Sequence, residues 1–334
     1  MTQIYLIGAP VDCGSPQVGC VSGPAALRQA GIASELIRLG HQVIDGGDLP
    51  TRAIHGISHQ NPAISRLTDS AGWVQTLQQA TRQLAGSSVL PIFLGGDHLL
   101  AAGTIPPLCA PANADPRPLF VLWLDAHADF HTLTSTQSGN LHGTPAAYVC
   151  GQGSFDGVFP PLAHPLDPAR LCQVGVRSID RAEHDLLARL PTRLVTMSAL
   201  NEAGPAQSLQ PFLDSVIAAN GRLHLSFDID CLDPSVAPGV GTAVENGISL
   251  AQAGAIMSLV RDCQRLSSVD IAELNPQLDT AGQSARAVVQ LMAVLFGPPG
   301  NGSGQQNQSS RDDRIDYRCE NRSRTPTEDQ CRTE

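Results

Sequence analysis

Short apolar runs recur along the chain, and most are followed by a turn-rich loop or by a segment with the spacing of a helix. Runs without polar alternation predict strands that are buried on both faces, as in a parallel sheet. We expect such strands at residues 3–8, 41–45, 89–94, 119–124, 173–176, 223–227 and 269–272. Helices are expected at residues 24–39, 69–85, 249–266 and 280–296, and in a segment that ends at Leu190. This alternation predicts an α/β fold, with one domain of three layers (α/β/α) around a mostly parallel central sheet.

The composition changes after the last expected helix. Residues 298–334 are rich in Gly, Asn, Ser, Gln and Pro, and Ile315 and Tyr317 are nearly their only large apolar residues. Such a segment cannot bury enough surface to offset the entropy that ordering would cost. We therefore expect a folded domain at residues 1–297 and a disordered tail at residues 298–334.

The charge balance bears on the partners of the protein. Acidic residues outnumber Lys and Arg by 31 to 21, and a net charge of −10 argues against a nucleic-acid surface, which needs a basic stripe. The N-terminus lacks the basic and long apolar regions of a secretory signal, and no apolar run approaches membrane-spanning length. The nine cysteines show no CxxC pairing, which fits reduced thiols. We expect a cytoplasmic protein that binds neither nucleic acid nor membrane.

Metal-binding residue types follow the apolar run at residues 119–124. Asp125, His127 and Asp129 alternate with two alanines, so the three side chains can turn toward one point beyond the carboxyl end of the strand. Open parallel sheets place their ligands at that edge. Two carboxylates and an imidazole suit a divalent ion such as Mn²⁺ or Zn²⁺ better than they suit a packed core.

Three other expected strands end in residues of the same kinds. His98 follows a glycine pair after one strand, Asp228 and Asp230 follow another, and Glu273 follows a third. Six ligand-type residues with four carboxylates exceed the needs of a single ion, so the sequence favours a binuclear site with Asp125 and Asp228 as bridges. Two metals roughly 3.5–4 Å apart can share a water, lower its pKa and supply hydroxide to an electrophilic carbon. This chemistry is that of a hydrolase.

Five stretches together resemble the arginase/agmatinase (ureohydrolase) family, and its arginase branch in particular. The resemblance spans about residues 3–297, and the stretches are residues 95–98, 125–129, 138–143, 226–234 and 273–276. It implies that two Mn²⁺ ions per chain hold a bridging hydroxide, which attacks the guanidinium carbon of L-arginine to give L-ornithine and urea. The implied ligands of one ion are His98, Asp125, Asp129 and Asp228. Those of the other are Asp125, His127, Asp228 and Asp230.

The resemblance also implies roles for residues around the metals. His142 would shuttle a proton, Glu273 would pair with the guanidinium, and Asp129 would belong to the catalytic group as well as to the ligands. The loop at residues 134–140 looks like the family loop that receives the substrate carboxylate. Further substrate-binding residues would be Ser138 and Asn140 for that carboxylate, Asp180 and Glu183 for the α-amino group, and Thr242 near the guanidinium.

The chain departs from the family pattern in two places. His131 stands where arginases typically carry Asn, and it is followed by Thr-Leu instead of Thr-Pro. A titratable imidazole in a loop expected to bind a carboxylate makes His131 a candidate substrate residue. Cys231 replaces a residue that is often small. Neither change touches an implied metal ligand, so hydrolysis is better supported than the exact substrate.

Other interpretations stand beside this one. The enzyme could act on another guanidino or amidino compound, such as agmatine, a guanidino acid or formiminoglutamate. A metal-stabilised assembly protein without catalysis is a different class, although no implied ligand is lost. Asp180 and Glu183 also fit acids that the dipole favours at a helix N-terminus. The family commonly forms trimers or hexamers, which we expect here.

Overall fold

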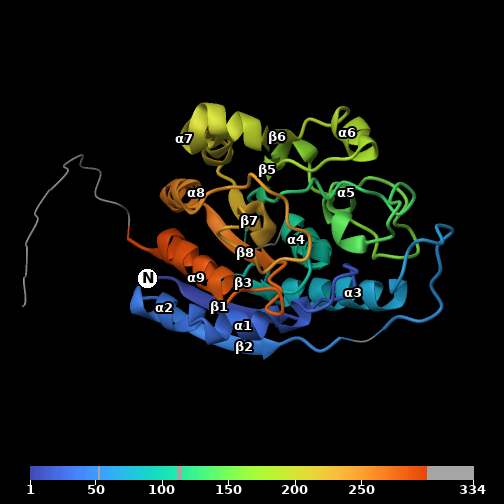
Figure 1. The fold of residues 1–334 in the computed structure, drawn as a ribbon, viewed down its shortest axis with the longest axis horizontal. Coiled ribbons are helices and arrows are strands. Elements are labelled where there is room, and N and C mark those ends of the chain that lie inside the picture. The colour runs from blue at the N-terminus through green and yellow to red at the C-terminus, as the bar shows by residue number, and fades with distance from the viewer. Residues whose placement is uncertain (52, 111–114, 299–334) are drawn as a thin grey trace, which may run out of the picture. The chain divides into compact units, whose positions relative to one another are not determined.

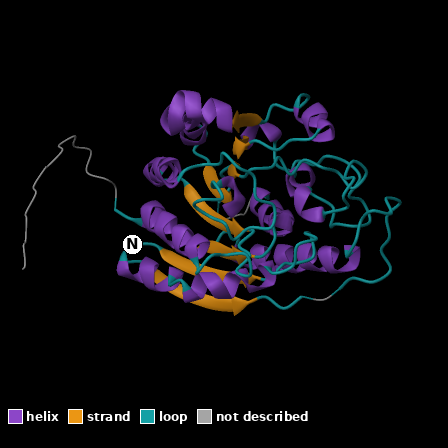
Figure 2. Cartoon of the chain, viewed as in Figure 1, coloured by secondary structure: helices purple, strands orange, loops and turns teal. Residues whose placement is uncertain are grey.

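Eight parallel strands form one central sheet, as Figures 1 and 2 show. The structure, a computed structural model, describes residues 1–298 apart from residue 52 and residues 111–114. The strands lie in the order β2-β1-β3-β8-β7-β4-β5-β6, and all neighbouring pairs are parallel. Their bounds are β1 Gln3–Ala9, β2 Gln42–Asp48, β3 Leu90–Gly95, β4 Leu119–Leu124, β5 Leu171–Val176, β6 Arg193–Thr196, β7 Arg222–Asp228 and β8 Leu266–Ala272.

Helices cover both faces of the sheet. One hydrophobic core contains α1, α2, α7, α8 and α9, and the other contains α3, α4, α5 and α6. The bounds are α1 Gly23–Gln29, α2 Ile32–Arg38, α3 Leu67–Leu84, α4 Ala101–Cys109, α5 Pro145–Val149, α6 Arg181–Leu187, α7 Met197–Ala218, α8 Leu250–Cys263 and α9 Gln283–Phe296. Short 3-10 helices are η1 Cys20–Ser22, η2 His98–Leu100, η3 Leu141–Gly143, η4 Pro168–Arg170 and η5 Ile229–Cys231. The predicted three-layer α/β/α fold is confirmed.

Strand β4 explains why the central apolar run has no polar alternation. Phe120, Leu122 and Leu124 point into one core, while the residues between them point into the other. All six residues of β4 are buried, because helices cover both faces of a parallel sheet. The pattern therefore identified the strand with its bounds.

Two parts of the fold differ from the prediction. The helix expected at residues 24–39 is broken into α1 and α2 by Gly31, whose φ of 90° no right-handed helix accommodates. Strand β6 and helices α5 and α7 were not predicted. Helix α7 contains Gly204 at φ 76°, followed by Pro205, so its helical pattern is interrupted where the chain kinks.

The sheet order brings the metal-binding motifs together. Strands β3, β8, β7 and β4 are consecutive neighbours in the middle of the sheet, although they come from distant parts of the chain. Their carboxyl ends carry His98, Glu273, Asp228 and Asp125. None of the described helices combines the length and apolarity that crossing a membrane requires. The tail expected at residues 298–334 lies, except for Pro298, outside the described residues.

Candidate metal centre and active site

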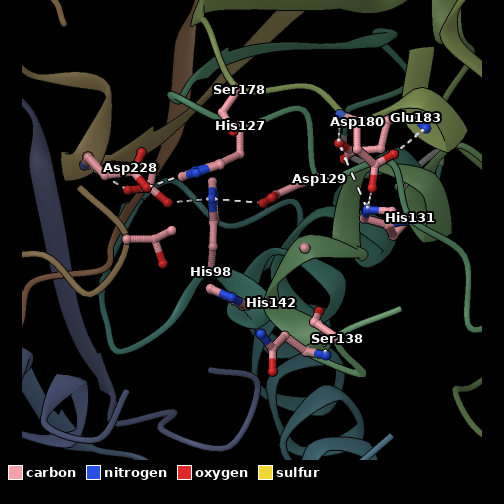
Figure 3. A pocket seen from close by; sticks show the side chains of 14 residues that line it. His98, His127, Asp129, His131, Ser138, His142, Ser178, Asp180, Glu183 and Asp228 are labelled. Carbon is pink, nitrogen blue, oxygen red and sulfur yellow. Dashed lines mark hydrogen bonds and ion pairs between the residues drawn. The ribbon is translucent and has the colours of Figure 1, made fainter. Parts of the chain in front are cut away.

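The imidazole of His98 is surrounded by three carboxylates. Its Nδ1 lies 2.9 Å from Asp228 Oδ2, 3.1 Å from Asp125 Oδ2 and 3.3 Å from Asp129 Oδ2, and Figure 3 shows the ring between Asp228 and Asp129. Its Nε2 lies 2.9 Å from Ser226 Oγ, which can accept the ring proton. A single N–H on Nδ1 could not satisfy three acceptors, whereas a lone pair on that atom and three carboxylate oxygens make a donor set for one divalent ion.

A second cluster lies beside the first and shares Asp125 with it. The Nδ1 atom of His127 lies 3.0 Å from Asp230 Oδ2 and 3.5 Å from Asp125 Oδ1. The carboxylate of Asp125 therefore turns one oxygen toward each imidazole, as a bridging ligand would. Trp123 fixes this orientation by donating its ring N–H to Asp125 Oδ2 at 2.9 Å.

The backbone at the strand ends fixes the other carboxylates. Asp228 Oδ1 accepts the backbone N–H of Asp230 at 2.8 Å, and Asp230 Oδ1 accepts that of Ala126 at 3.1 Å. Asp129 has a positive φ of 54°, in the left-handed region that non-glycine residues seldom adopt. Such backbone strain is found at sites where the surrounding structure imposes a side-chain direction.

The charges of this centre fit two divalent cations. Four buried carboxylates face only two imidazoles. Burial, and then the charge of Asp125, raises the pKa of Asp129 to about 7, while burial and the charge of Asp230 raise the pKa of Asp228 well above its usual range. Asp129 Oδ2 has no well-formed hydrogen bond among the described residues, and its nearest partner is His98 Nδ1 at 3.3 Å. Bound cations would relieve both the excess negative charge and the poorly bonded oxygen.

His142 and Glu273 form a pair next to the metal centre. His142 Nδ1 lies 2.9 Å from Glu273 Oε1, which also accepts the backbone N–H of His98 at 2.9 Å. Burial alone would lower the pKa of His142, but the negative charge of Glu273 raises it to about 9. Burial would likewise raise the pKa of Glu273, but His142 lowers it. Both shifts favour the charged form of the pair, with the proton on the imidazole.

The other oxygen of Glu273 has a partner that was not singled out from the sequence. The thiol of Cys20 donates to Glu273 Oε2 at 3.7 Å. Burial, and then the charge of Glu273, raises the pKa of this thiol above its usual value, so the thiol keeps its proton. Glu273 itself has a positive φ of 65°. Three donors and a strained backbone therefore fix its carboxylate.

One cavity brings most of the predicted site residues together, as Figure 3 shows. Asp125 and Glu273 do not line it, but they are buried within the same cluster of contacts. The predicted residues in its wall are His98, His127, Asp129, His131, Ser138, Asn140, His142, Asp180, Glu183, Asp228, Asp230 and Thr242. Residues from distant parts of the sequence, from His98 to Thr242, thus line the same cavity.

The far end of the cavity is built around the N-terminus of α6. Asp180 caps this helix through Oδ1, and Glu183 closes a capping box by accepting the backbone N–H of Asp180. Asp180 and Glu183 therefore hold helix N-terminal positions and line the cavity at the same time. Asp180 Oδ2 lies 2.7 Å from His131 Nε2, and His131 Nδ1 lies 3.2 Å from Ser135 Oγ. Both nitrogens of His131 are thus in contact with protein atoms.

Two positioning residues were missed from the sequence. The guanidinium of Arg177 donates to the backbone oxygens of Asp230 at 2.9 Å, Cys231 at 3.2 Å and Val244 at 2.8 Å, so it ties the metal loop to the loop that carries Thr242. Arg177 follows an expected strand, which is the only local signal it gave.

The second missed residue is Asn61. Its amide donates to the backbone oxygens of Leu133 at 3.0 Å and Thr136 at 2.8 Å, which supports the loop that carries Ser138. No local pattern links Asn61 to that loop, because more than 70 residues separate them.

A buried, carboxylate-rich centre that could hold divalent cations, with a histidine–glutamate pair beside it, fits the class of metal-dependent hydrolases. Comparisons with known proteins identify the family within this class. The family model described as "Arginase family" matches residues 2–297. The chain is 45% identical to an arginase of Brucella melitensis over 292 residues, which cover 87% of this chain and 95% of that protein. The chain therefore belongs to the arginase family and is an amidinohydrolase.

Solved structures agree with this assignment. The arginase of Bacillus caldovelox superposes with a TM-score of 0.80 at 32% identity, covering 89% of this chain and 99% of that one. The arginase of Entamoeba histolytica in complex with L-ornithine superposes with a TM-score of 0.78 at 27% identity, covering 89% of this chain and 100% of that one. The fold of the family carries a binuclear metal site, and the two ligand clusters lie where such a site is expected.

Proposed function

We propose that this protein hydrolyses L-arginine to L-ornithine and urea with two Mn²⁺ ions per chain. The observation that carries the proposal is a single cavity with cation ligands at one end and polar groups for an amino acid at the other. The identity to arginases and the likeness to an arginase that binds L-ornithine support it. A donor set of carboxylates with two imidazoles suits Mn²⁺ among the available divalent metals.

The ligands divide between the two ions as follows. One ion would be held by His98, Asp125, Asp129 and Asp228, and the other by Asp125, His127, Asp228 and Asp230. Once bound, the ions would lower the pKa of a shared water and so supply the nucleophile at neutral pH. Asp129, which also lines the cavity, would in addition orient the attacking water.

Glu273 and His142 would act on the guanidinium. A planar guanidinium pairs well with a carboxylate, so Glu273 would orient the reacting carbon. The guanidinium would compete with His142 for Glu273, and Thr242 would contact its outer nitrogens. Because the charge of Glu273 raises the pKa of His142, this competition would make His142 a stronger acid. His142 would then release its Nδ1 proton toward the leaving nitrogen.

The far end would recognise the amino-acid part of the substrate. Ser138 and Asn140 offer neutral donors to a carboxylate, and Asp180 and Glu183 would face the α-amino group. Agmatine lacks the carboxylate and would leave these donors unpaired. Polar sites can turn such a loss into discrimination on the order of 10⁴-fold.

A substrate panel tests the proposal. Manganese-loaded protein should hydrolyse L-arginine with a higher kcat/KM than agmatine, guanidinobutyrate or formiminoglutamate, with ornithine and urea as the products from arginine. A higher kcat/KM for one of the other three would establish the alternative substrate instead. No turnover of any compound, with both metals bound, would favour a metal-binding protein without catalysis.

Further proposals concern the context of the enzyme. We propose a homotrimer or homohexamer, as is common in the family. We propose a cytoplasmic location, where the seven described cysteines, all free thiols, would stay reduced. We also propose that residues 298–334 are dispensable for catalysis, because every proposed site residue lies before residue 274.

A further inference from the structure

The far end of the cavity contains a small network in which His131 contacts the acids proposed to face the α-amino group. His131 Nε2 contacts Asp180 Oδ2 at 2.7 Å, and the dashed lines in Figure 3 join the imidazole to the acids on α6. His131 Nδ1 contacts Ser135 Oγ at 3.2 Å, and the backbone N–H of His131 donates to Gly143. The imidazole is only 16% exposed, so these contacts hold it in place.

Three of the four carboxylate oxygens in this network accept a backbone N–H, and the fourth, Asp180 Oδ2, forms an ion-pair contact with His131. Asp180 Oδ1 accepts the backbone N–H groups of Ala182 at 2.8 Å and Glu183 at 3.1 Å, and Oδ2 faces His131. Glu183 Oε1 accepts the backbone N–H of Phe130 at 3.0 Å, and Oε2 accepts that of Asp180 at 3.2 Å. An incoming ammonium group would have to share or displace a donor that is already bound.

The neighbouring loop differs in this respect. Asn140 makes no side-chain hydrogen bond within the described residues, and Ser138 has only a 3.4 Å contact with Thr136 Oγ1 and a bond from the backbone N–H of Asn140. Amide and hydroxyl donors are therefore available to a substrate carboxylate, while the acids are occupied. The cavity is better prepared for a carboxylate than for an ammonium group.

We infer that His131 determines specificity by occupying Asp180, so that the enzyme acts on ω-guanidino carboxylic acids with little regard to an α-amino group. The inference rests on the proposed function and deepens it, because it defines the substrate class of the same site. A site whose acid is left unpaired by an analogue can reject that analogue by about 10⁴-fold. Here the analogue without the amino group leaves no oxygen unpaired, so the structural reason for rejection is absent.

Two substitutions of His131 distinguish the contact made by Nδ1 from the contact made by Nε2. His131→Asn places its amide near the position of Nδ1 and cannot reach Asp180, whereas His131→Gln can place a donor near the position of Nε2. The amide of Gln should therefore keep Asp180 occupied, and that of Asn should leave it unpaired. An exposed histidine on α6, His184, provides a control substitution, His184→Asn, that touches neither acid of the network.

The experiment compares L-arginine with 5-guanidinopentanoate, which is arginine without its α-amino group, on the metal-loaded enzyme. Wild-type protein should prefer L-arginine by less than about 10²-fold in kcat/KM, well below the 10⁴-fold of a site that depends on the missing group. His131→Asn should increase this preference at least about tenfold, mainly through KM, while His131→Gln and His184→Asn leave it unchanged. A larger wild-type preference, or equal behaviour of the Asn and Gln variants, overturns the inference.

A binding measurement on the wild-type protein does not depend on how the variants fold. L-Ornithine and 5-aminopentanoate differ only in the α-amino group, and their inhibition constants should differ by less than about 10²-fold. If neither guanidino acid is hydrolysed, or if agmatine is preferred, the proposed function fails while this ratio still decides the inference. If L-arginine is hydrolysed but ornithine binds far more tightly than 5-aminopentanoate, the function stands and the inference fails.

Discussion

The two ends of the cavity are built in different ways. The metal end consists of side chains that follow β3, β4 and β7. Five of its six proposed ligand residues are buried, and the sixth, His127, is partly exposed. The far end consists of the loop at residues 131–140 and the first turn of α6, where Asp180 is half exposed. Strand ends in the middle of a sheet cannot move without disrupting their neighbours, whereas a loop and a helix cap can change more freely.

This difference separates the chemistry from the choice of substrate. The metal end keeps the full set of residues implied by the family, so the reaction class follows from it. The far end carries His131 and its contact with Asp180, so the specificity can differ from that of relatives. Substitutions at the metal end should abolish turnover, and those at the far end should mainly change KM.

The largest effect is expected for Asp228→Ala. Asp228 lies 2.9 Å from His98 and is a ligand of both ions in our proposal. Loss of a residue that only hydrogen-bonds to a metal ligand already lowers metal affinity or activity by about 10–100-fold. Loss of a bridging ligand should therefore lower kcat/KM by more than about 10²-fold and reduce the metal content per chain. Elemental analysis and urea assays measure both. Asp262→Asn, on an exposed acid far from the site, is the control, and full activity with two ions in the Asp228 variant would contradict the bridging role.

Glu273→Gln should have the next largest effect. The substitution keeps the size of the side chain and removes the charge that orients the guanidinium, so kcat should fall by about 10²-fold or more. Both metals should remain, because Glu273 contacts His142, His98 N–H and Cys20 rather than a cation ligand atom. Metal loss in this variant would make Glu273 a ligand and would extend the metal end beyond the residues assigned here.

Asn61→Ala should show how strongly the far end depends on support from outside the cavity. The amide of Asn61 donates two hydrogen bonds to the loop, and each is worth about 1 kcal/mol net. KM for L-arginine should rise by about tenfold, with kcat changed much less. Asn61→Asp keeps the oxygen that accepts Ala63 N–H but removes both donated bonds, so it should resemble the Ala variant. A fall in kcat at constant KM would show that the loop positions the reacting end as well.

The smallest effect is a pH dependence of stability in protein stripped of metal. The pKa of His142 is about 9 in the folded protein, because Glu273 outweighs the effect of burial, and about 6.5 is usual for an unfolded histidine. The pair should therefore stabilise the fold fully below about pH 6.5, and this contribution should be lost as pH rises through about 9. Wild type should exceed Glu273→Gln in Tm by about 2–4 °C near pH 6 and by less at pH 9. A difference that does not vary with pH would show that the pair is not ionised.

Much of the fold could be predicted because its signals are local. The run at residues 119–124 has the composition of a strand that is covered on both faces, and β4 has those bounds. Strand β6 and helix α7 could not be predicted, since β6 is short and α7 is interrupted at Gly204. The residues of the metal end could be predicted because each follows a strand directly and the ends of parallel strands share one edge.

The contacts of the far end could not be predicted in the same way. His131, Ser138 and Asp180 were expected to contact a substrate, but no sequence pattern indicates that His131 and Asp180 contact each other. Asn61 and Arg177 act through backbone oxygens of residues that lie more than 50 positions away. Backbone oxygens are present at every position, so no residue pattern marks which of them receives a long-range hydrogen bond.

The sequence by itself determined the α/β class, the strand ends that carry ligands, and the chemistry that four carboxylates and two imidazoles support. The tertiary structure decided which strands are neighbours, that Asp125 turns one oxygen toward each imidazole, and that His142 and Glu273 form an ion pair. It also decided that His131 occupies Asp180. The physical reason is that composition and periodicity report the burial of each segment, whereas the pairing of two polar atoms depends on distances fixed only when the whole sheet has assembled.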